Sequence, residues 1–291
     1  MIKVSVVNSV GEYKLQDIQD ETLGRALAKG GMSGLEYAST RVSSFNKAGE
    51  DGIFISNMFY GERRISIPGV IYGKVTDATY EQARRDLITA FSIHKDSQGY
   101  LLPLTLKFTT NDGVDFQVTG QAVNITVKRS AFYLAEYMID FLSDSIYIQK
   151  QSLTSVAITP YVGGGFIVPF VLPVTFSAGS GGSVIVTNNG STPNLPTIVL
   201  TGPLTTPRLL NATTGFSMAL NMTLIAGDVV TIDMANRTII QGTSTNRMST
   251  KSSDSEFWWL DPGNNTIILT TGSSGDTGTA TVQFRDSFYG V

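Results

Sequence analysis

The chain contains one histidine, His94, and no cysteine, so it carries few of the side chains that enzymes use for nucleophilic or metal chemistry. A catalytic triad needs a histidine that acts as a base, held by an acid and facing a nucleophile. Only His94 is available for that role, and a partly exposed histidine at the end of a predicted helix is its more ordinary interpretation. Sites that need two imidazoles or a thiolate within one subunit are excluded.

Acidic residues in the second half of the chain are the next candidates for chemistry. Polysaccharide hydrolysis uses two carboxylates that face each other across a cleft. Asp228, Asp233 and Asn236 also offer hard oxygens for calcium, but their spacing matches no EF-hand loop. Most of the acids instead stand beside Gly, Pro, Asn or Ser, as turn-forming aspartates do: Asp228, Asp233, Asp254, Glu256, Asp261, Asp276 and Asp286. We therefore expect no enzymatic activity, no metal and no cofactor.

Two adjacent tryptophans, Trp258 and Trp259, are the candidate contact residues. On a strand they would point to opposite faces, one inward and one outward. The outward ring would be free to stack on a sugar or to pack against a neighbouring subunit. The alternative is one tryptophan in the core and one half-covered by loops.

Charge is distributed unevenly along the chain. Residues 1–150 contain 16 Lys and Arg with 17 Asp and Glu, whereas residues 151–291 contain 5 and 7. Together with the Gly163-Gly164-Gly165 run, this shift predicts a first domain at 1–150, a linker region at 151–165 and a second domain at 166–291. The basic doublets Arg63-Arg64 and Arg84-Arg85 are expected on solvated faces or in charge contacts between subunits.

The same composition excludes two classes of partner. The net charge of −3 provides no basic surface for nucleic acid. The longest apolar stretch, Phe166 to Phe176, is interrupted by prolines and is too short to span a membrane. We expect neither nucleic-acid nor membrane binding.

The first half has the pattern of one helix and an antiparallel sheet. An apolar stripe predicts a helix from about residue 78 to 93, formed by Tyr80, Ala83, Leu87 and Phe91. Alternating apolar residues at 104–108 and 114–118 flank Asn111-Asp112-Gly113 and predict a hairpin. Residues 123–127 and 133–141 predict two further strands, and residues 65–67 and 70–72 flank Pro68-Gly69.

The second half reads as all β. Residues 216–224, 230–234, 258–260, 267–269 and 280–284 alternate apolar with polar side chains, and Gly, Pro and Asn separate them. The expected fold is thus mainly β. It comprises an N-terminal antiparallel sheet with a helix and a C-terminal β-sandwich of jelly-roll or galectin-like type.

Several segments of the second half resemble, in order, the C-terminal domain of siphophage distal tail proteins. They are Thr197 to Pro203, then Pro207, Asn211 and Thr213 to Gly215, then Gly227 to Asp233 and Arg237-Thr238, and finally Trp259 to Ile267. The last of these is similar to the family's closing hairpin in its Pro262-Gly263, Asn265 and Ile267. The resemblance covers about ninety residues, and it is looser in the first domain.

The resemblance implies a virion protein of the tail tip, assembled in the cytoplasm of a bacterial host. Its first, belt-type domain would close a homo-hexameric ring, and a galectin-like domain would lie outside it. The implied partners are the chain itself, the major tail tube protein, the tail-associated hub protein, and side or receptor-binding proteins. A chain without residues 160–291 would then still form rings. A carbohydrate- or receptor-binding module and a polysaccharide hydrolase are the other two hypotheses.

Overall fold

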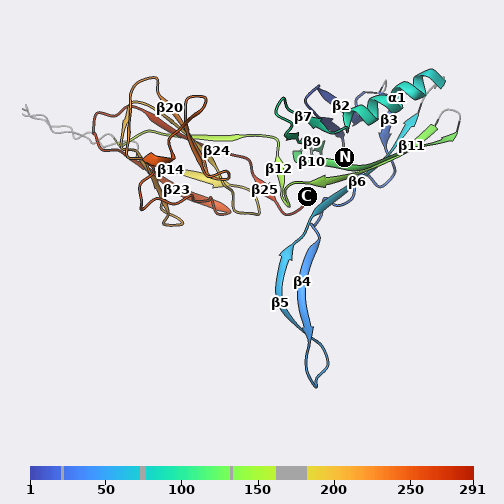
Figure 1. Cartoon of the computed structure of the whole chain (residues 1–291), viewed down its shortest axis with the longest axis horizontal. Coiled ribbons are helices and arrows are strands. Elements are labelled where there is room, and N and C mark those ends of the chain that lie inside the picture. Colours follow the sequence, from blue (N-terminus) through green and yellow to red (C-terminus); the bar gives the residue numbers. More distant parts are fainter. Residues whose placement is uncertain (21–22, 73–76, 132–133, 162–181) are drawn as a thin grey trace, which may run out of the picture. The chain divides into compact units, whose positions relative to one another are not determined.

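The computed structural model describes residues 1–20, 23–72, 77–131, 134–161 and 182–291, which divide into two compact units (Figure 1). The first unit comprises Met1–Gln151 together with Phe288–Val291, and the second comprises Ser152–Ser287. Antiparallel sheets dominate both units, and a helix lies in the first, so the mainly β class is confirmed. In the described part of the chain, no helix has the length and apolar character needed to cross a membrane.

The first unit is built on a large antiparallel sheet with the strand order β2-β1-β9-β10-β11-β6-β3. Its strands are β1 (Lys3–Val7), β2 (Glu12–Asp17), β3 (Arg25–Leu27), β6 (Arg63–Tyr72), β9 (Leu104–Thr109), β10 (Asp115–Ala131) and β11 (Leu134–Ser143), and β12 (Ile148–Lys150) pairs with β10. Two small hairpins complete the unit, β4 (Thr40–Asn46) with β5 (Ile53–Tyr60), and β7 (His94–Lys95) with β8 (Leu101–Leu102).

The helix α1 (Asp77–Ala90) covers one face of this sheet. Tyr80, Leu87 and Phe91 are buried in the same apolar core as the inward side chains of the strands. Helical spacing therefore identified the buried face correctly, although the helix ends at Ala90 rather than near residue 93. His94 consequently lies in the β7–β8 hairpin and not at a helix end.

The hairpin predicted around Asn111-Asp112-Gly113 is present as β9 and β10, with Gly113 in the left-handed region at φ +82°. The separate strand predicted at residues 123–127 is instead part of β10, which is 17 residues long. Irregularities in its pairing with β11, between Ala122 and Asn124 and between Arg129 and Ala131, bend the strand without ending it. Alternation alone therefore did not distinguish one long, bent strand from two short ones.

Strand β6 passes through Pro68-Gly69 without interruption and pairs with β11 over its whole length. The ring of Tyr137, the residue opposite Gly69, lies over the glycine, and a Cβ at position 69 would overlap that ring. Gly69 is thus required by the close approach of a neighbouring side chain rather than by a turn.

The second unit contains two antiparallel sheets with the orders β13-β24-β15-β20-β21-β22 and β14-β23-β17-β18. Apolar side chains from both sheets form one core, so the unit is a β-sandwich. The strands of the first sheet are β13 (Thr154–Ile158), β15 (Thr197–Thr201), β20 (Val229–Asp233), β21 (Thr238–Gln241), β22 (Thr245–Asn246) and β24 (Thr279–Phe284). The second sheet has β14 (Ser183–Asn188), β17 (Arg208–Asn211), β18 (Ser217–Ala219) and β23 (Gly263–Thr270). Smaller elements are β16 (Leu204–Thr205), β19 (Thr223–Leu224) and η1 (Met248–Thr250). Strand β25 (Ser287–Phe288) instead pairs with β12 in the large sheet of the first unit.

The chain crosses between the two units twice, after Gln151 and before Phe288. Strand β13 occupies residues 154–158, inside the linker region expected at 151–165, and the Gly163-Gly164-Gly165 run lies outside the described residues. We call Phe288–Val291 the return segment, because it packs in the first unit. A first domain cut near residue 160 would therefore lack part of its own structure.

Replacing Gly69 with alanine should destabilise the first unit selectively, by about 1–3 kcal/mol, because the new methyl group overlaps the Tyr137 ring. Both tryptophans of the chain belong to the second unit, so their fluorescence in urea reports that unit alone. Hydrogen exchange of peptides from β6 and β11 reports the first unit. The matched control is Gly275→Ala in an open loop, which should leave both signals unchanged. Equal exchange in the two variants would contradict the packing argument.

Candidate interaction surface

The two tryptophans lie in different surroundings. Trp258 is fully buried in the core of the second unit, and its indole Nε1 has no hydrogen-bond partner among the residues that the structure describes. Trp259 is partly exposed; its ring lies 5.2 Å from that of Phe216, and its Nε1 donates to Asp261 Oδ1 at 2.9 Å. A sugar or a protein surface therefore has access only to Trp259 of the pair.

The acids of the second unit hold loops and turns. Asp233 accepts hydrogen bonds from the backbone N–H groups of Ala235 and Asn236 at 2.9 and 2.8 Å. Asp276, which is buried, accepts from the N–H of Thr205 at 2.7 Å. Among the described residues, no group of three or more His, Cys, Asp or Glu side chains is arranged to hold a metal ion. These carboxylates have structural partners, as the turn interpretation expected.

The basic doublets do not share one environment. Arg64 is exposed and contacts Glu62 at 2.7 Å, and Arg84 contacts Glu81 at 3.4 Å. Arg63 is only 1% exposed, so the expectation that both residues of its doublet are solvated is wrong. The strand period explains the difference, because Arg63 and Arg64 are consecutive in β6 and must point to opposite faces.

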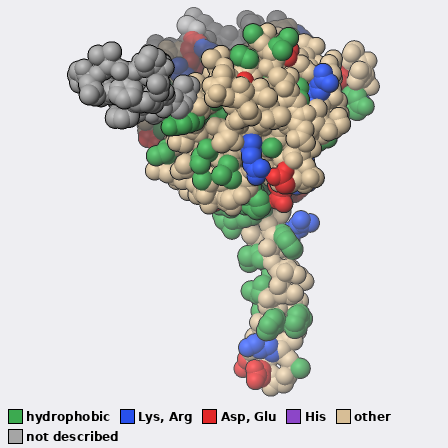
Figure 2. Space-filling model, turned by 90° about the vertical axis from the view of Figure 1, so that its left-hand side faces the viewer, with side chains coloured by type: hydrophobic (Ala, Val, Ile, Leu, Met, Phe, Trp, Pro, Cys, Tyr) green, Lys and Arg blue, Asp and Glu red, His purple; other side chains and the backbone are tan. Residues whose placement is uncertain are grey.

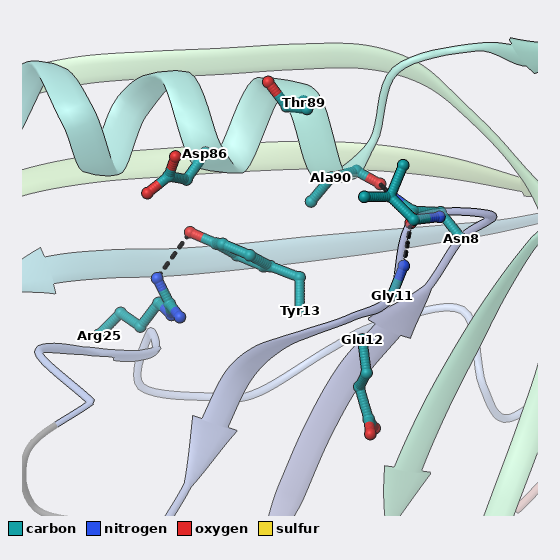
Figure 3. A pocket seen from close by; sticks show the side chains of 9 residues that line it. Asn8, Gly11, Glu12, Tyr13, Arg25, Asp86, Thr89 and Ala90 are labelled. Atoms are coloured by element: carbon teal, nitrogen blue, oxygen red, sulfur yellow. Dashed lines mark hydrogen bonds between the residues drawn. The ribbon is translucent and has the colours of Figure 1, made fainter.

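A groove of about 440 Å³ lies between α1 and the β1–β2 turn (Figure 3). The Arg25 guanidinium sits 4.0 Å above the Tyr13 ring centroid and donates to the Tyr13 hydroxyl at 2.7 Å. Asn8 donates to the carbonyl of Ala90 at 3.0 Å, which joins the turn to the end of α1. Asp86 accepts from the side chain of Gln82 at 2.7 Å. Of these contacts only that of Asn8 joins the helix to the sheet, whereas Arg25 and Asp86 are engaged with partners in the sheet and in the helix respectively.

The most unusual surface of the first unit is the hairpin of β4 and β5, residues 40–60, which we call the arm. It projects from the unit as a two-stranded ribbon, and in the described part of the chain neither strand pairs with a third (Figure 1). Val42 lies opposite Met58, and Arg41 lies opposite Phe59. Because neighbouring positions along a strand face opposite sides, Met58 and Phe59 give both faces of the arm an apolar character.

Large apolar side chains cover the arm, as Figure 2 shows in green. Seven of them are between 46% and 62% exposed: Val42, Phe45, Ile53, Phe54, Ile55, Met58 and Phe59. Phe45 and Phe54 are stacked on each other, with centroids 5.3 Å apart. Exposed apolar side chains gathered on one element in this way are typical of a surface that associates with another molecule.

Sequence reasoning missed the arm, although its signal is visible. Residues Ile53 to Tyr60 form a nearly continuous apolar run after the turn residues Gly49 to Gly52. Such a run is typical of a buried strand. Pattern alone does not reveal whether the apolar side chains are covered within the same chain or by a partner.

The root of the arm, residues 37–39 and 60–61, is held by aromatic and hydrogen-bond contacts. Tyr37 and Tyr60 meet edge to face with ring centroids 5.4 Å apart, and Tyr60 stacks on Tyr289 of the return segment at 5.2 Å. Hydrogen bonding with Tyr37, together with burial, raises the pKa of Tyr60 to about 12. The N–H of Gly61 donates to the carbonyl of Ser39 at 2.6 Å, closing the ribbon.

Substituting the two tryptophans separately should give opposite results. Trp258→Ala should destabilise the second unit by about 3–5 kcal/mol, because it removes a fully buried ring. Trp259→Ala should cost only about 1 kcal/mol, the scale of one aromatic pair. The remaining tryptophan reports urea unfolding in each variant. Similar losses in the two variants would contradict the assignment of one inner and one outer ring.

Comparison with known proteins agrees with this architecture. Residues 189–288 match the sequence model of the family described as "Siphovirus-type tail component, C-terminal domain". A search of curated protein sequences found no match. The crystal structure of the Dit protein of phage SPP1, described as a paradigm of the hub adsorption apparatus in phages that infect Gram-positive bacteria, matches with a TM-score of 0.67 and 14% identity. The match covers 98% of this chain and 99% of that one.

Two structures of the phage P2 baseplate in its activated conformation are also similar. One, with Ca, has a TM-score of 0.51 at 9% identity, and the other, with Sr, has 0.52 at 12% identity. Each match covers 97% of this chain and 97% of the other. At these low identities the structural matches show the fold alone. The family model covers residues 189–288. Residues 189–288 thus match the C-terminal domain of the siphovirus-type tail component family, and the chain as a whole has the fold of the SPP1 Dit protein.

Proposed function

We propose that the chain is a structural protein of the distal end of a siphophage tail, where six copies form a ring through their first units. The ring would join the tail tube protein to the hub protein, and the second units would offer docking sites for side or receptor-binding proteins. The fold match over the whole chain supports this role, and the exposed apolar arm is the observation that carries the ring. The proposed location is the virion tail tip, after assembly in the host cytoplasm.

The arm needs a partner for physical reasons. An isolated two-stranded hairpin is only marginally stable in water. Burying one large apolar side chain contributes about 1.5–3 kcal/mol, so association of an arm with seven such side chains in the open is strongly favoured. Both edges of the ribbon also carry unpaired backbone groups, which favour pairing with another strand.

A closed ring of identical subunits needs two different, complementary surfaces on each copy. The arm supplies one. The exposed face of the sheet supplies a second, a groove of about 340 Å³ whose apolar lining residues are Ala28, Pro68, Val70 and Met138. Lys128 and Glu136 also line this groove and offer opposite charges to an incoming strand. We propose that the arm of one copy lies in this groove of the next.

The oligomer should be visible directly. Light scattering of the purified chain should give the mass of a hexamer, and negative-stain images should show six-fold rings with an open centre. A chain that stays monomeric or trimeric at every concentration and ionic strength tested would overturn the proposed ring.

Charging the arm should abolish the ring and leave the fold intact. In the variant Met58→Asp/Phe59→Asp, both new carboxylates would be exposed to water in the monomer. Because they lie on opposite faces of the arm, at least one of them would be buried when the arm docks. The control is Ile185→Asp in the second unit, where the side chain is exposed to 60%, against 62% for Phe59. Light scattering should find monomers for the arm variant and rings for the control. Rings in both variants would show that the arm does not close them.

The alternative, a saccharide-binding module, rests on Trp259, whose ring is the accessible one of the pair. Glycan-array binding by the wild-type chain that Trp259→Ala removes would favour this alternative. Unchanged binding in that variant, or none in the wild type, would count against it.

A further inference from the structure

The return segment contacts the first unit at the root of the arm, although the whole second unit separates the two in sequence. Tyr289 stacks on Tyr60, the last residue of β5, and lies 5.6 Å edge to face from Tyr147. The N–H of Val291 donates to the carbonyl of Leu35 at 3.2 Å. Phe288 packs edge to face on Phe116, with centroids 5.8 Å apart.

Arg63 ties this segment to the rest of the unit. Its Nε donates to the carbonyl of Ile146 at 3.0 Å, and its Nη1 donates to Gly34 and Leu35 at 2.7 and 3.1 Å. Its Nη2 donates to the carbonyl of Tyr289. The guanidinium therefore bridges the loop before the arm, the loop before β12 and the return segment. Without the return segment, the Nη2 group of a buried cation would lose this acceptor.

The fit of the segment is tight at Gly290. A Cβ at this position would overlap the carbonyl oxygen of Glu36, so only glycine lets the two backbones approach. The arm begins at Thr40, a few residues after Glu36, and ends at Tyr60, three residues before Arg63. The return segment thus contacts the chain both before and after the arm.

We propose that the return segment is a clamp that sets the direction of the arm, with Arg63, Tyr60 and Tyr289 as its positioning residues. Residues 288–291 follow the second unit in the chain, so the clamp closes only after the second unit has been synthesised. The arm is then presented in its docking orientation only by a chain that carries both units. We call this requirement for both units the assembly checkpoint. The checkpoint rests on the proposed ring, whereas the contact of the clamp with the arm does not.

Two substitutions open the clamp without shortening the chain. Gly290→Val forces the segment away from Glu36, and Tyr289→Ala removes the ring stacked on Tyr60 but keeps the backbone carbonyl that Arg63 binds. Val291→Ala is the matched control in the same segment, because it keeps the backbone N–H that binds Leu35.

The clamp is tested by hydrogen exchange of peptides that span residues 36–42 and 58–64. Measuring it in the monomeric Met58→Asp/Phe59→Asp background separates protection by the clamp from protection by neighbouring subunits. We expect amide hydrogen exchange at the root to be about tenfold faster in Gly290→Val, because that variant loses a ring contact and a hydrogen bond. The increase in Tyr289→Ala should be smaller, because that variant loses the ring contact alone. Peptides of β20 and β23 in the second unit, and the Val291→Ala control, should be unchanged.

Unchanged exchange at the root in Gly290→Val and Tyr289→Ala would overturn the clamp. Acceleration spread evenly over β1, β9 and β10 would also overturn it, because the segment would then support the unit at large.

In a chain with an intact arm, Gly290→Val should need about tenfold more protein to assemble, as light scattering would measure. Normal assembly with a loosened root would refute the checkpoint and leave the clamp. A wild-type chain that forms no rings would refute the proposed function while the exchange result still decides the clamp.

Discussion

A buried guanidinium must find acceptors for its N–H groups, and this requirement at Arg63 organises the first unit. Its four hydrogen bonds within the described part of the chain go to backbone carbonyl oxygens rather than to a carboxylate. Burial lowers the pKa of the arginine, but an arginine stays protonated inside a protein, so the cation and its acceptors must remain together. Carbonyl groups are fixed to the main chain, and an arginine that binds them therefore positions backbone segments more directly than an ion pair between flexible side chains would.

The backbone segments that Arg63 binds meet where the arm begins. The arm has apolar side chains on both faces and unpaired edges, so it contributes little to the stability of the monomer. In the proposed ring the role of the arm lies in what it contacts, and its direction matters as much as its composition. The tyrosines at the root restrict that direction, because stacked rings resist rotation about the ribbon axis.

Local periodicity predicted much of the fold. The stripe from Tyr80 to Phe91 identified the helix and its buried face, and the alternation around Asn111 to Gly113 identified the β9–β10 hairpin. The same alternation did not show that β10 continues to Ala131, because a bulge hides the continuity of a strand. The mainly β character of the second half was also predicted, whereas the strand order of the sandwich was not, because it depends on contacts between residues far apart in sequence.

The surface was harder to predict than the core. Arg63 and Arg64 look alike in sequence, yet the strand period buries one and exposes the other. The apolar run from Ile53 to Tyr60 has the composition of a core strand and lies in water. Neither the role of Tyr289 nor that of Gly290 is signalled by a nearby residue, because Tyr60 and Glu36, which they contact, precede them by more than two hundred positions.

The second unit is inserted into the first rather than appended to it. Its two junctions are neighbours in the first unit, since Lys150 Nζ lies 5.7 Å from the ring of Phe288. Close junctions allow a domain to be replaced by another of different size without stretching its host. A double covalent attachment also divides a pulling force on the inserted unit between two strands of the chain. The first unit can thus keep its own structure while the inserted unit differs in size or sequence.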